Sequence, residues 1–440
     1  MQEQSRPADD LPPDDDAHGS GLIRITLLAL LAGAFAGLVG GLFRVALTEA
    51  ERWRTSLLEW TREAPALRWL VPVALAAAAI ALARLIVRWV PEASGSGVQR
   101  VEAAVRDEIP LASRLRILPA KFVGGVLAIG GGLALGREGP SVHMGAVIGE
   151  RIAAAARLST HDTRTMTSAL GGAGLAVAFS APLGGAVFVF EELSRAFRTK
   201  LVLATLAGVV AAMAVARLLV GSAPIFAIVP IRAEETWKLL LFAGLGMLLG
   251  ALGVAYNRLI IVMIDAFESV RSLPPEVKAG IIGALVGVLG IIAPSWVGSG
   301  DALNEEVLLG GVSILALVLI LVVRGLLGPL SYSLGAPGGL FAPLLLVGAA
   351  AGALLANLVN AVVPAAHAST TAFAVVGMST FFAAVVRAPL TGVILIIEMT
   401  ASTALVVPML LAAGIAVVTA TALKGEPIYD TLRRRLHDHV

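Results

Sequence analysis

The chain has 440 residues, of which 57% are hydrophobic and only 15% are charged, and its mean hydropathy is +0.87. This balance excludes a soluble globular protein of this size and indicates a polytopic membrane protein. Cysteine is absent and the six histidines are scattered. Disulfides, thiolate metal sites and the usual histidine metal motifs are therefore excluded, and we expect no cofactor.

The charge is unevenly distributed along the chain. The formal net charge is +2, but residues 1–20 carry six acidic residues and one arginine, a net charge of −5, so the rest carries about +7. This segment has three prolines and little apolar content, and it lacks the basic start of a signal peptide. We predict that 1–20 is a disordered acidic tail.

Thirteen apolar stretches follow the tail, and several are too short or too interrupted to be simple 20-residue spans. Glycine is concentrated inside them and is the residue that lets helices approach closely in lipid. The pattern predicts an all-α protein of tilted and broken helices, typical of transporters. The stretches are 21–49, 69–90, 117–134, 141–157, 168–190, 201–230, 238–265, 279–293, 307–330, 340–364, 371–386, 389–400 and 404–423.

The C-terminal end is basic. Lys424, Arg433, Arg434 and Arg435 lie in the last 17 residues, and the positive-inside tendency places such a segment in the cytoplasm. We expect one transmembrane domain over 21–423 and a short basic cytoplasmic helix or tail over 424–440.

Gly136-Arg137-Glu138-Gly139-Pro140 is the most informative stretch. An ionisable residue at membrane depth costs roughly 2.5–3.5 kcal/mol on insertion scales and is a functional-site hypothesis by default. The glycines and the proline break the helix and free backbone N–H groups. A carboxylate beside free N–H groups can take an anion's place and can carry a proton, so the stretch predicts a gated anion pathway.

The chain also repeats itself. Residues 93–97 (Ala-Ser-Gly-Ser-Gly) match 296–300 (Trp-Val-Gly-Ser-Gly) at an offset of 203, and 136–140 match 339–343 at the same offset. Residues 180–185, ending at Glu191, match 387–392, ending at Glu398, at an offset of 207. Repeats in a membrane chain indicate a pseudo-two-fold with the site between the halves. We place the halves at about 25–200 and 235–423.

These motifs resemble those of the CLC-type chloride transporters and channels, from about residue 25 to 440. They are Gly95-Ser96-Gly97, the stretch 136–140, Gly338-Gly339-Leu340-Phe341-Ala342-Pro343, and the tyrosine of Pro427-Ile428-Tyr429. The resemblance implies two inverted-topology halves, broken helices aimed at the anion, and a homodimer with one pore per subunit. It also implies chloride and protons as substrates, a lipid bilayer, no nucleic acid and no enzymatic activity.

The resemblance further implies the anion site. Ser96 matches the central anion-site serine, where serine is similar to chloride-preferring members and proline to nitrate-preferring ones. Leu340 and Phe341 match backbone N–H donors, and Tyr429 matches the inner-gate tyrosine. Gln99 departs from the proline that the family usually has.

Glu138 matches the family's external gating glutamate, with the backbone at Arg137 and Gly139 forming the outer anion site. We do not expect Glu138 to pair with its neighbour Arg137, because adjacent residues rarely face each other. Glu192 matches the internal proton-transfer glutamate, with Glu102 and Arg198 as a supporting network.

Three other residues are interpreted as structural rather than as part of the transport pathway. Glu191, beside Glu192 at a helix C-terminus, opposes the macrodipole and needs a partner. Its repeat mate Glu398 is interpreted as structural or as part of a dimer interface. For His143 we favour a buried, hydrogen-bonded, neutral histidine over a role in coupling.

The leading hypothesis is a proton-coupled chloride antiporter; the alternative is a passive chloride channel on the same scaffold, against which Glu192 argues. A fluoride exporter is disfavoured by the intact stretch 136–140 and by Tyr429. An intramembrane serine hydrolase would use Ser96 as nucleophile and His143 as base, but the sequence shows neither a third orienting residue nor a Gly-x-Ser-x-Gly elbow.

The compact size of the chain resembles that of bacterial members of the family, so we expect an inner-membrane protein with both termini in the cytoplasm.

Overall fold

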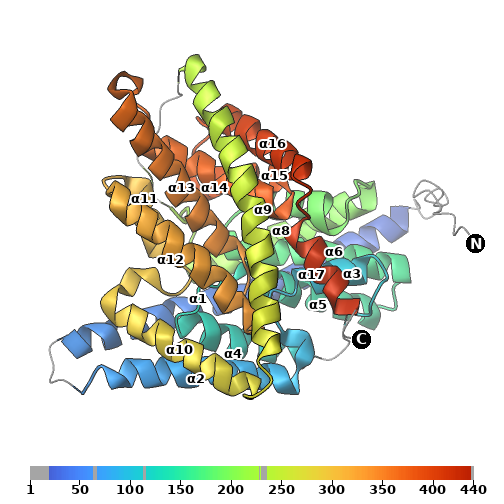
Figure 1. The fold of residues 1–440 in the computed structure, drawn as a ribbon. Coiled ribbons are helices and arrows are strands. Elements are labelled where there is room, and N and C mark those ends of the chain that lie inside the picture. Colours follow the sequence, from blue (N-terminus) through green and yellow to red (C-terminus); the bar gives the residue numbers. More distant parts are fainter. Residues whose placement is uncertain (1–18, 63–66, 112–114, 227, 229–234, 438–440) are drawn as a thin grey trace, which may run out of the picture.

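The computed structural model describes residues 19–62, 67–111, 115–226, 228 and 235–437. The predicted acidic tail lies outside this part of the chain, except for Gly19 and Ser20, which begin the first helix. The described residues form helices joined by short turns, with one isolated β-bridge and no strand. This confirms the all-α prediction (Figure 1).

The helices fall into two series that follow the repeat. The first series is α1 (Gly19–Arg62), α2 (Leu70–Trp89), α3 (Val98–Val105), α4 (Ile117–Gly130), α5 (Glu138–Ala155), α6 (Thr160–Phe179), α7 (Pro182–Phe188), which runs into a π-helical turn (Val189–Leu193), and α8 (Thr199–Val220). The second series is α9 (Leu239–Ser269), α10 (Pro275–Ile292), α11 (Asp301–Leu309), α12 (Ile314–Ser333), α13 (Phe341–Val362), α14 (Thr370–Val386), α15 (Pro389–Thr400) and α16 (Val406–Ala422). Helix α17 (Ile428–His437) ends the described chain.

Seven helices of the described chain are long and apolar enough to cross a bilayer: α1, α2, α8, α9 with its preceding turn, α10, α12 and α13. Large apolar side chains on these helices face outward; Leu218, Leu240 and Val362 are each more than three-quarters exposed. Such exposure is unfavourable in water and normal in lipid. The short helices α3, α7 and α11 have 8, 7 and 9 residues, too few to span hydrocarbon alone.

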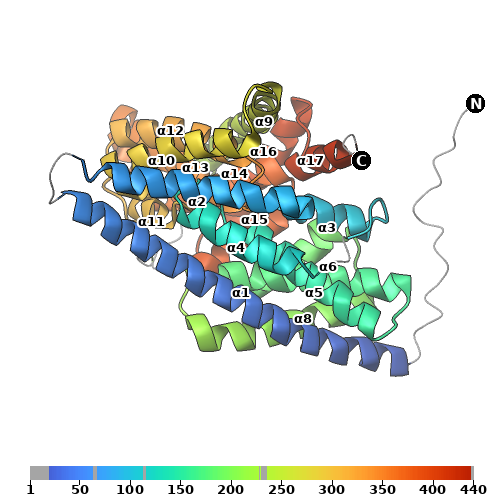
Figure 2. The same cartoon turned by 90° about the horizontal axis from the view of Figure 1, so that it is seen from below.

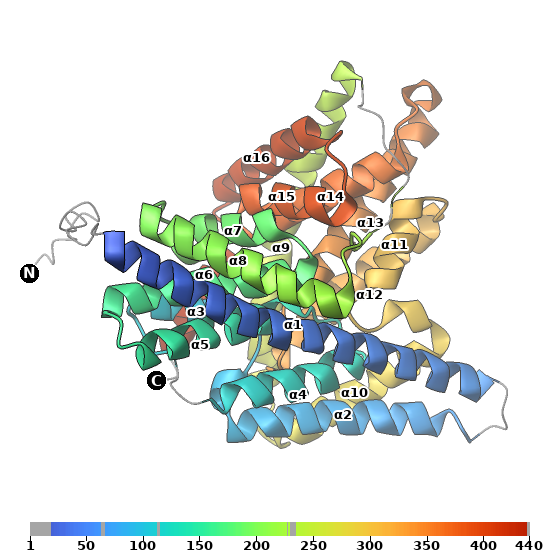
Figure 3. The ribbon, with the colours of Figure 1, turned by 180° about the vertical axis from the view of Figure 1, so that it is seen from behind.

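Small residues hold the long helices together. Helices α1 and α8 lie side by side along α8, and α1 continues beyond it (Figure 3). Their backbones approach closely, since a β-carbon at Gly37 would lie only 2.2 Å from the carbonyl oxygen of Ala212. Helices α2 and α10 also lie side by side (Figure 2). Backbone contact of this kind replaces the hydrophobic drive that is absent between helices in lipid.

Hydrogen bonds between the halves follow the 203-residue offset. Gly136 and Gly339, which are repeat mates, exchange two backbone hydrogen bonds of 2.8 and 2.7 Å in an antiparallel bridge. Gly95 N–H donates to Gly335 O at 3.2 Å, and Gly298 N–H donates to Gly132 O at 2.7 Å, which is the same bond made from the other half. An exchange of this kind is what a local two-fold between the halves requires.

Two buried cations hold equivalent loops. Lys121 Nζ donates to the carbonyl oxygens of Ser94, Gly95 and Ser96 at 3.3, 2.6 and 3.1 Å. Its repeat mate Arg324 donates to those of Trp296, Gly298 and Ser299 at 2.9, 3.0 and 2.9 Å. Each cation therefore satisfies carbonyls that the broken backbone leaves without helical partners, as a lipid-embedded protein must.

The close contact of α1 with α8 generates a stability prediction. Gly37→Val should destabilise the protein by about 1–3 kcal/mol, because the new side chain would collide with the backbone at Ala212. Thermal unfolding of the purified protein in detergent measures the loss. Gly244→Val is the matched control, since nothing lies within 4 Å of a β-carbon built at Gly244. An equal loss in both variants would contradict the packing argument.

Candidate functional site

The carboxylate of Glu138 lies on the N-terminus of a helix from the other half. Glu138 begins α5 and is fully buried. Its Oε1 accepts hydrogen bonds from the backbone N–H groups of Phe341, at 2.7 Å, and Ala342, at 3.3 Å, in the first turn of α13. A helix N-terminus is a ready anion site because its N–H groups are unpaired and its dipole is positive. The carboxylate therefore occupies a position suited to a free anion.

Two glycines make room for this carboxylate. A β-carbon at Gly136 would lie 2.1 Å from Glu138 Oε2, and one at Gly339 would lie 2.6 Å from Oε1. The bridged backbone at Gly136 and Gly339 therefore packs directly against the carboxylate, and any side chain at either position would collide with it. Glu138 Oε2 is buried and has no hydrogen-bond partner among the described residues, so it remains open to a proton.

Ser96 and Tyr429 supply two buried hydroxyls on the other side of Glu138. Ser96 lies between Gly95 and Gly97, whose φ angles are +58° and +90°, and a β-carbon at Gly139 would lie 2.2 Å from Ser96 Oγ. Tyr429 is the second residue of α17, and its side chain lies within interaction distance of the Ser96 side chain. The two hydroxyls lie close enough to interact with each other, but neither makes a hydrogen bond of good geometry to any described residue. Two buried donors without an acceptor suit an anion.

Phe341 links these parts. Its backbone N–H donates to Glu138, while its buried ring stacks on Phe179 and packs edge-on against Phe188 and Phe382. The ring of Tyr429 lies 5.9 Å from that of Phe341 between centroids. Leu340 is buried directly before α13. One of the two amides predicted to face the anion is thus engaged by Glu138.

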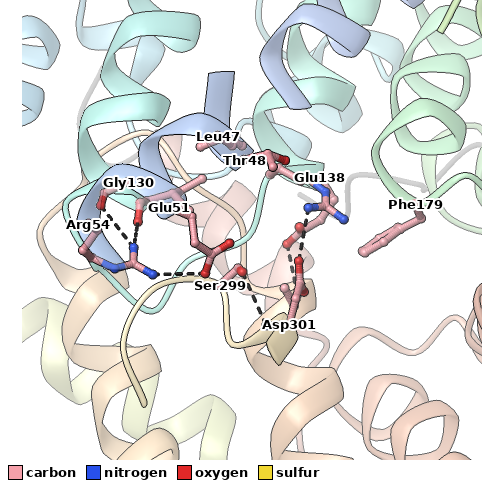
Figure 4. A pocket seen from close by; sticks show the side chains of 12 residues that line it. Leu47, Thr48, Glu51, Arg54, Gly130, Glu138, Phe179, Ser299 and Asp301 are labelled. Atoms are coloured by element: carbon pink, nitrogen blue, oxygen red, sulfur yellow. Dashed lines mark hydrogen bonds and ion pairs between the residues drawn. The ribbon is translucent and has the colours of Figure 1, made fainter. Parts of the chain in front are cut away.

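Arg137 turns away from its neighbour Glu138. Its Nε donates to Ala178 O at 2.9 Å, and its guanidinium pairs with Asp301 at 3.1 Å. Asp301 begins α11 in the second half and, like Glu138, lines a cavity of about 30 Å³ (Figure 4), room for one or two water-sized groups. Sequence reasoning missed Asp301, although it directly follows the repeated Gly-Ser-Gly at 298–300.

Glu192 lies in the π-helical turn that follows α7, a local form that is frequent at functional sites. It is only 1% exposed. Arg195 approaches Glu192 at 3.8 Å and Glu102 at 3.5 Å, and Arg106 pairs with Glu102 at 2.5 Å. The predicted partnership of Glu192 with Glu102 is therefore real in space, and one guanidinium lies between the two acids.

The predicted place of Arg198 in this network is wrong. Arg198 precedes α8 and its guanidinium lies 3.0 Å from His161 Nε2 on an exposed surface. Arg195 takes the expected position because its backbone adopts a left-handed conformation, with φ of +48°, just after the π-helical turn. That reversal directs the nearer arginine back to the acids.

Helix α17 closes the network from the C-terminal end. Asp430 pairs with Arg195 at 3.2 Å and with Arg433 at 3.1 Å. Partial burial alone would raise the pKa of Asp430, but Arg195 and Arg433 outweigh it and lower that pKa. Because Asp430 follows Tyr429 directly, one helical turn carries both the buried Tyr429 hydroxyl and a charge of the acid network.

Glu191 has the partner that its position demanded. Its carboxylate accepts from the N–H groups of Leu390, at 3.0 Å, and Thr391, at 2.7 Å, at the start of α15. Glu398 caps the start of α7 in the same way, accepting from Leu183 at 3.0 Å and Gly184 at 2.7 Å. The two repeat mates therefore exchange helix caps between the halves, and this gives Glu398 a structural contact.

His143 differs from the interpretation given above. It is buried, but neither ring nitrogen has a hydrogen-bond partner in the described part of the chain. A β-carbon at Gly97 would lie 2.5 Å from its Nδ1, so the ring packs against the serine loop. Because neither Ser96 nor His143 has any hydrogen-bond partner there, this geometry offers no base-activated serine.

No group of three His, Asp or Glu side chains that could hold a metal ion occurs among the residues described. The arrangement instead combines a carboxylate on helix amides, two buried hydroxyls and a second buried acid, Glu192. Such a set can bind a small anion and can carry protons.

A family model described as "Voltage gated chloride channel" matches residues 77–421. This chain belongs to that family. Its relatives include the H(+)/Cl(-) exchange transporter ClcA of Vibrio parahaemolyticus, 36% identical over 426 residues that cover 95% of this chain and 91% of the relative. ClcA of Citrobacter koseri is 36% identical over 422 residues, covering 94% of this chain and 89% of the relative.

Among solved structures, a slow cyanobacterial Cl-/H+ antiporter is similar, with a TM-score of 0.89 and 31% identity over 94% of this chain and 98% of that chain. A CLC-type fluoride/proton antiporter has a TM-score of 0.76 at 21% identity, over 93% of this chain and 97% of that one; that likeness concerns the fold alone. The recognition from motifs is thus confirmed.

The corrected acid network generates a second prediction. Arg195→Met should lower stability by about 2 kcal/mol, because it leaves the buried carboxylates of Glu102 and Glu192 without their shared cation. Arg198→Met removes only an exposed contact with His161 and should cost little. Thermal unfolding of both variants in detergent is the measurement. A larger loss for Arg198→Met would restore the original assignment.

Proposed function

We propose that this protein exchanges chloride for protons across a bacterial cell membrane. The observation that carries the proposal is the carboxylate of Glu138 on the amides of Phe341 and Ala342. A carboxylate there competes with chloride for the same N–H groups. Once protonated it is neutral and loses most of its attraction to the helix N-terminus, so release of the site and uptake of a proton become one event.

The anion pathway then continues past the buried hydroxyls. Ser96 and Tyr429 donate to the central chloride, and the amides of Leu340 and Phe341 complete its shell. Every one of these groups is a neutral donor, which holds an anion without the deep binding that a fixed cation would cause. The backbone at Arg137 and Gly139 forms the outer site, next to the cavity that Asp301 lines.

The proton pathway shares Glu138 with chloride and diverges inside at Glu192. The burial of Glu192 and its contact with Arg195 support this role, because a proton-transfer acid must be shielded yet reachable. Glu102 is a supporting member. Passive chloride conduction on the same scaffold is the competing function that the experiments below separate from exchange.

We also propose a homodimer with one pathway per subunit. Helices α7 and α15 are short and lie near α8 and α16 on one side of the molecule (Figure 3). These four helices carry exposed apolar side chains: Leu183, Leu206, Val210, Leu390, Val407 and Leu410. A second copy would cover these short helices, which cannot span the bilayer alone. All proposed site residues come from a single chain.

For orientation, we propose an inner membrane with both termini in the cytoplasm. The arginines of α17, Arg433, Arg434 and Arg435, support this by the positive-inside tendency. Glu192 then belongs to the cytoplasmic side and Glu138 to the outer side.

Glu138→Gln should abolish proton transport while chloride flux continues. A neutral amide keeps the size of the side chain but can neither carry a proton nor compete with chloride as an anion. The measurement is proton and chloride flux from proteoliposomes under a chloride gradient. Proton movement that persists in this variant would remove Glu138 from the pathway.

Glu192→Val separates exchange from passive conduction. In bilayers with opposing chloride and pH gradients, the wild type should reverse away from the chloride equilibrium potential, and the variant should reverse at it. Glu426→Val, which removes an exposed acid paired with Arg434, is the matched control and should behave as wild type. A wild type that already reverses at the chloride potential would make the protein a channel. Uphill proton transport by Glu192→Val would assign the internal acid elsewhere.

A further inference from the structure

Tyr332 is a buried tyrosine for which the function proposed above has no use. It lies near the end of α12, and the same end of that helix holds the serine loop: Gly335 O accepts from Gly95 N–H at 3.2 Å and from Ser94 Oγ at 3.0 Å. A β-carbon at Gly95 would lie 3.3 Å from the Tyr332 hydroxyl oxygen. The phenol therefore lies directly against the loop that carries Ser96.

Two N–H donors surround the phenol oxygen of Tyr332. Gln99 Nε2 donates to it at 3.4 Å, and the backbone N–H of Ser96 lies beside it in a position to donate. A tyrosine hydroxyl has one proton and accepts through its lone pairs. When donors occupy the acceptor side, the proton must point elsewhere.

With Gln99 Nε2 facing the phenol, the proton of the buried Tyr332 hydroxyl has no acceptor among the described residues, and Oε1 of the same amide is itself buried without a donor. Ser96 Oγ and Tyr429 Oη likewise make no hydrogen bond of good geometry to a described residue, and Tyr429 lies near Tyr332 and close enough to Ser96 for their side chains to interact. A buried hydroxyl without an acceptor is costly, and three together at one place indicate a common acceptor. The acceptor that fits three neutral O–H donors is an anion.

We propose that Tyr332 is a third hydroxyl donor to the central chloride, and that Gln99 is the positioning residue that turns its proton toward the anion. The proposal rests on the function proposed above and adds a binding residue to it. It also gives a reason for Gln99 where the family usually has proline, since a proline has no side-chain donor to offer the phenol.

The test is chloride binding to the purified protein by isothermal titration calorimetry. Tyr332→Phe should raise the dissociation constant about 10-fold, as expected for the loss of one hydrogen bond to a charged group. Tyr256→Phe is the matched control: Tyr256 is also buried with an unpartnered hydroxyl, but that hydroxyl lies against Gly328. Its dissociation constant should stay at the wild-type value. An equal increase in both variants would overturn the proposal.

Gln99→Leu tests the orientation and also serves if Tyr332→Phe does not yield folded protein. Alone it should raise the dissociation constant about 3-fold, since a turned phenol donates less well. Added to Tyr332→Phe, it should have no further effect, because the two residues act through one proton. A lower dissociation constant in Gln99→Leu would mean that Gln99 accepts the proton, and would overturn the proposal.

Ser96→Ala and Tyr429→Phe separate this inference from the proposed function. Both should weaken chloride binding whether or not Tyr332 takes part. If they do so while Tyr332→Phe binds chloride as wild type does, only the role of Tyr332 fails. If none of the three variants changes binding, the anion site itself is elsewhere.

Discussion

The backbone bridge between Gly136 and Gly339 is the constraint on which the rest of the site depends. It joins the two halves at equivalent positions, and so brings the start of α5 to the start of α13. A side chain at either glycine would collide with the carboxylate of Glu138. The bridge therefore fixes the position of the Glu138 carboxylate, and it requires that neither of the two residues beside that carboxylate carry a side chain.

Around this bridge, the backbone groups left unpaired at helix breaks receive hydrogen bonds from the same kinds of side chain in both halves. Lys121 and Arg324 each bind three loop carbonyls, and Glu191 and Glu398 each cap a helix of the other half. In lipid no water compensates these groups, so each half supplies partners for the other. The halves differ at the candidate site. The repeat mate of Glu138 is Phe341, and the backbone N–H of Phe341 donates to the carboxylate of Glu138.

The C-terminal helix α17 joins the buried hydroxyl of Tyr429 to the acid network of Glu102 and Glu192. Tyr429 packs on Phe341, while the next residue, Asp430, binds Arg195 and Arg433. Any displacement of Tyr429 must therefore strain ion pairs that also reach Glu102 and Glu192. This gives a physical route by which protonation in the acid network and the position of the Tyr429 hydroxyl can influence one another.

The sequence by itself determined the class of protein and the repeat, which pairs residues 136–140 with 339–343; the contact of Glu138 with the helix that begins at Phe341 appears only in the structure. A composition with 57% hydrophobic and 15% charged residues indicates a lipid environment, and glycines and prolines within apolar stretches indicate broken helices. The offset of 203 residues identified repeat mates, Gly136 and Gly339, that are hydrogen-bonded to each other in the structure.

Tertiary structure alone decided which cation pairs with Glu192, which groups Glu191 binds, and which residues surround Gln99, His143 and Asp301. A π-helical turn and the left-handed backbone of Arg195 place Arg195, and not Arg198, beside Glu192. No local sequence pattern predicts either feature. The partners of Glu191 and Gln99 lie about 200 residues away, so they exist only once the two halves are docked.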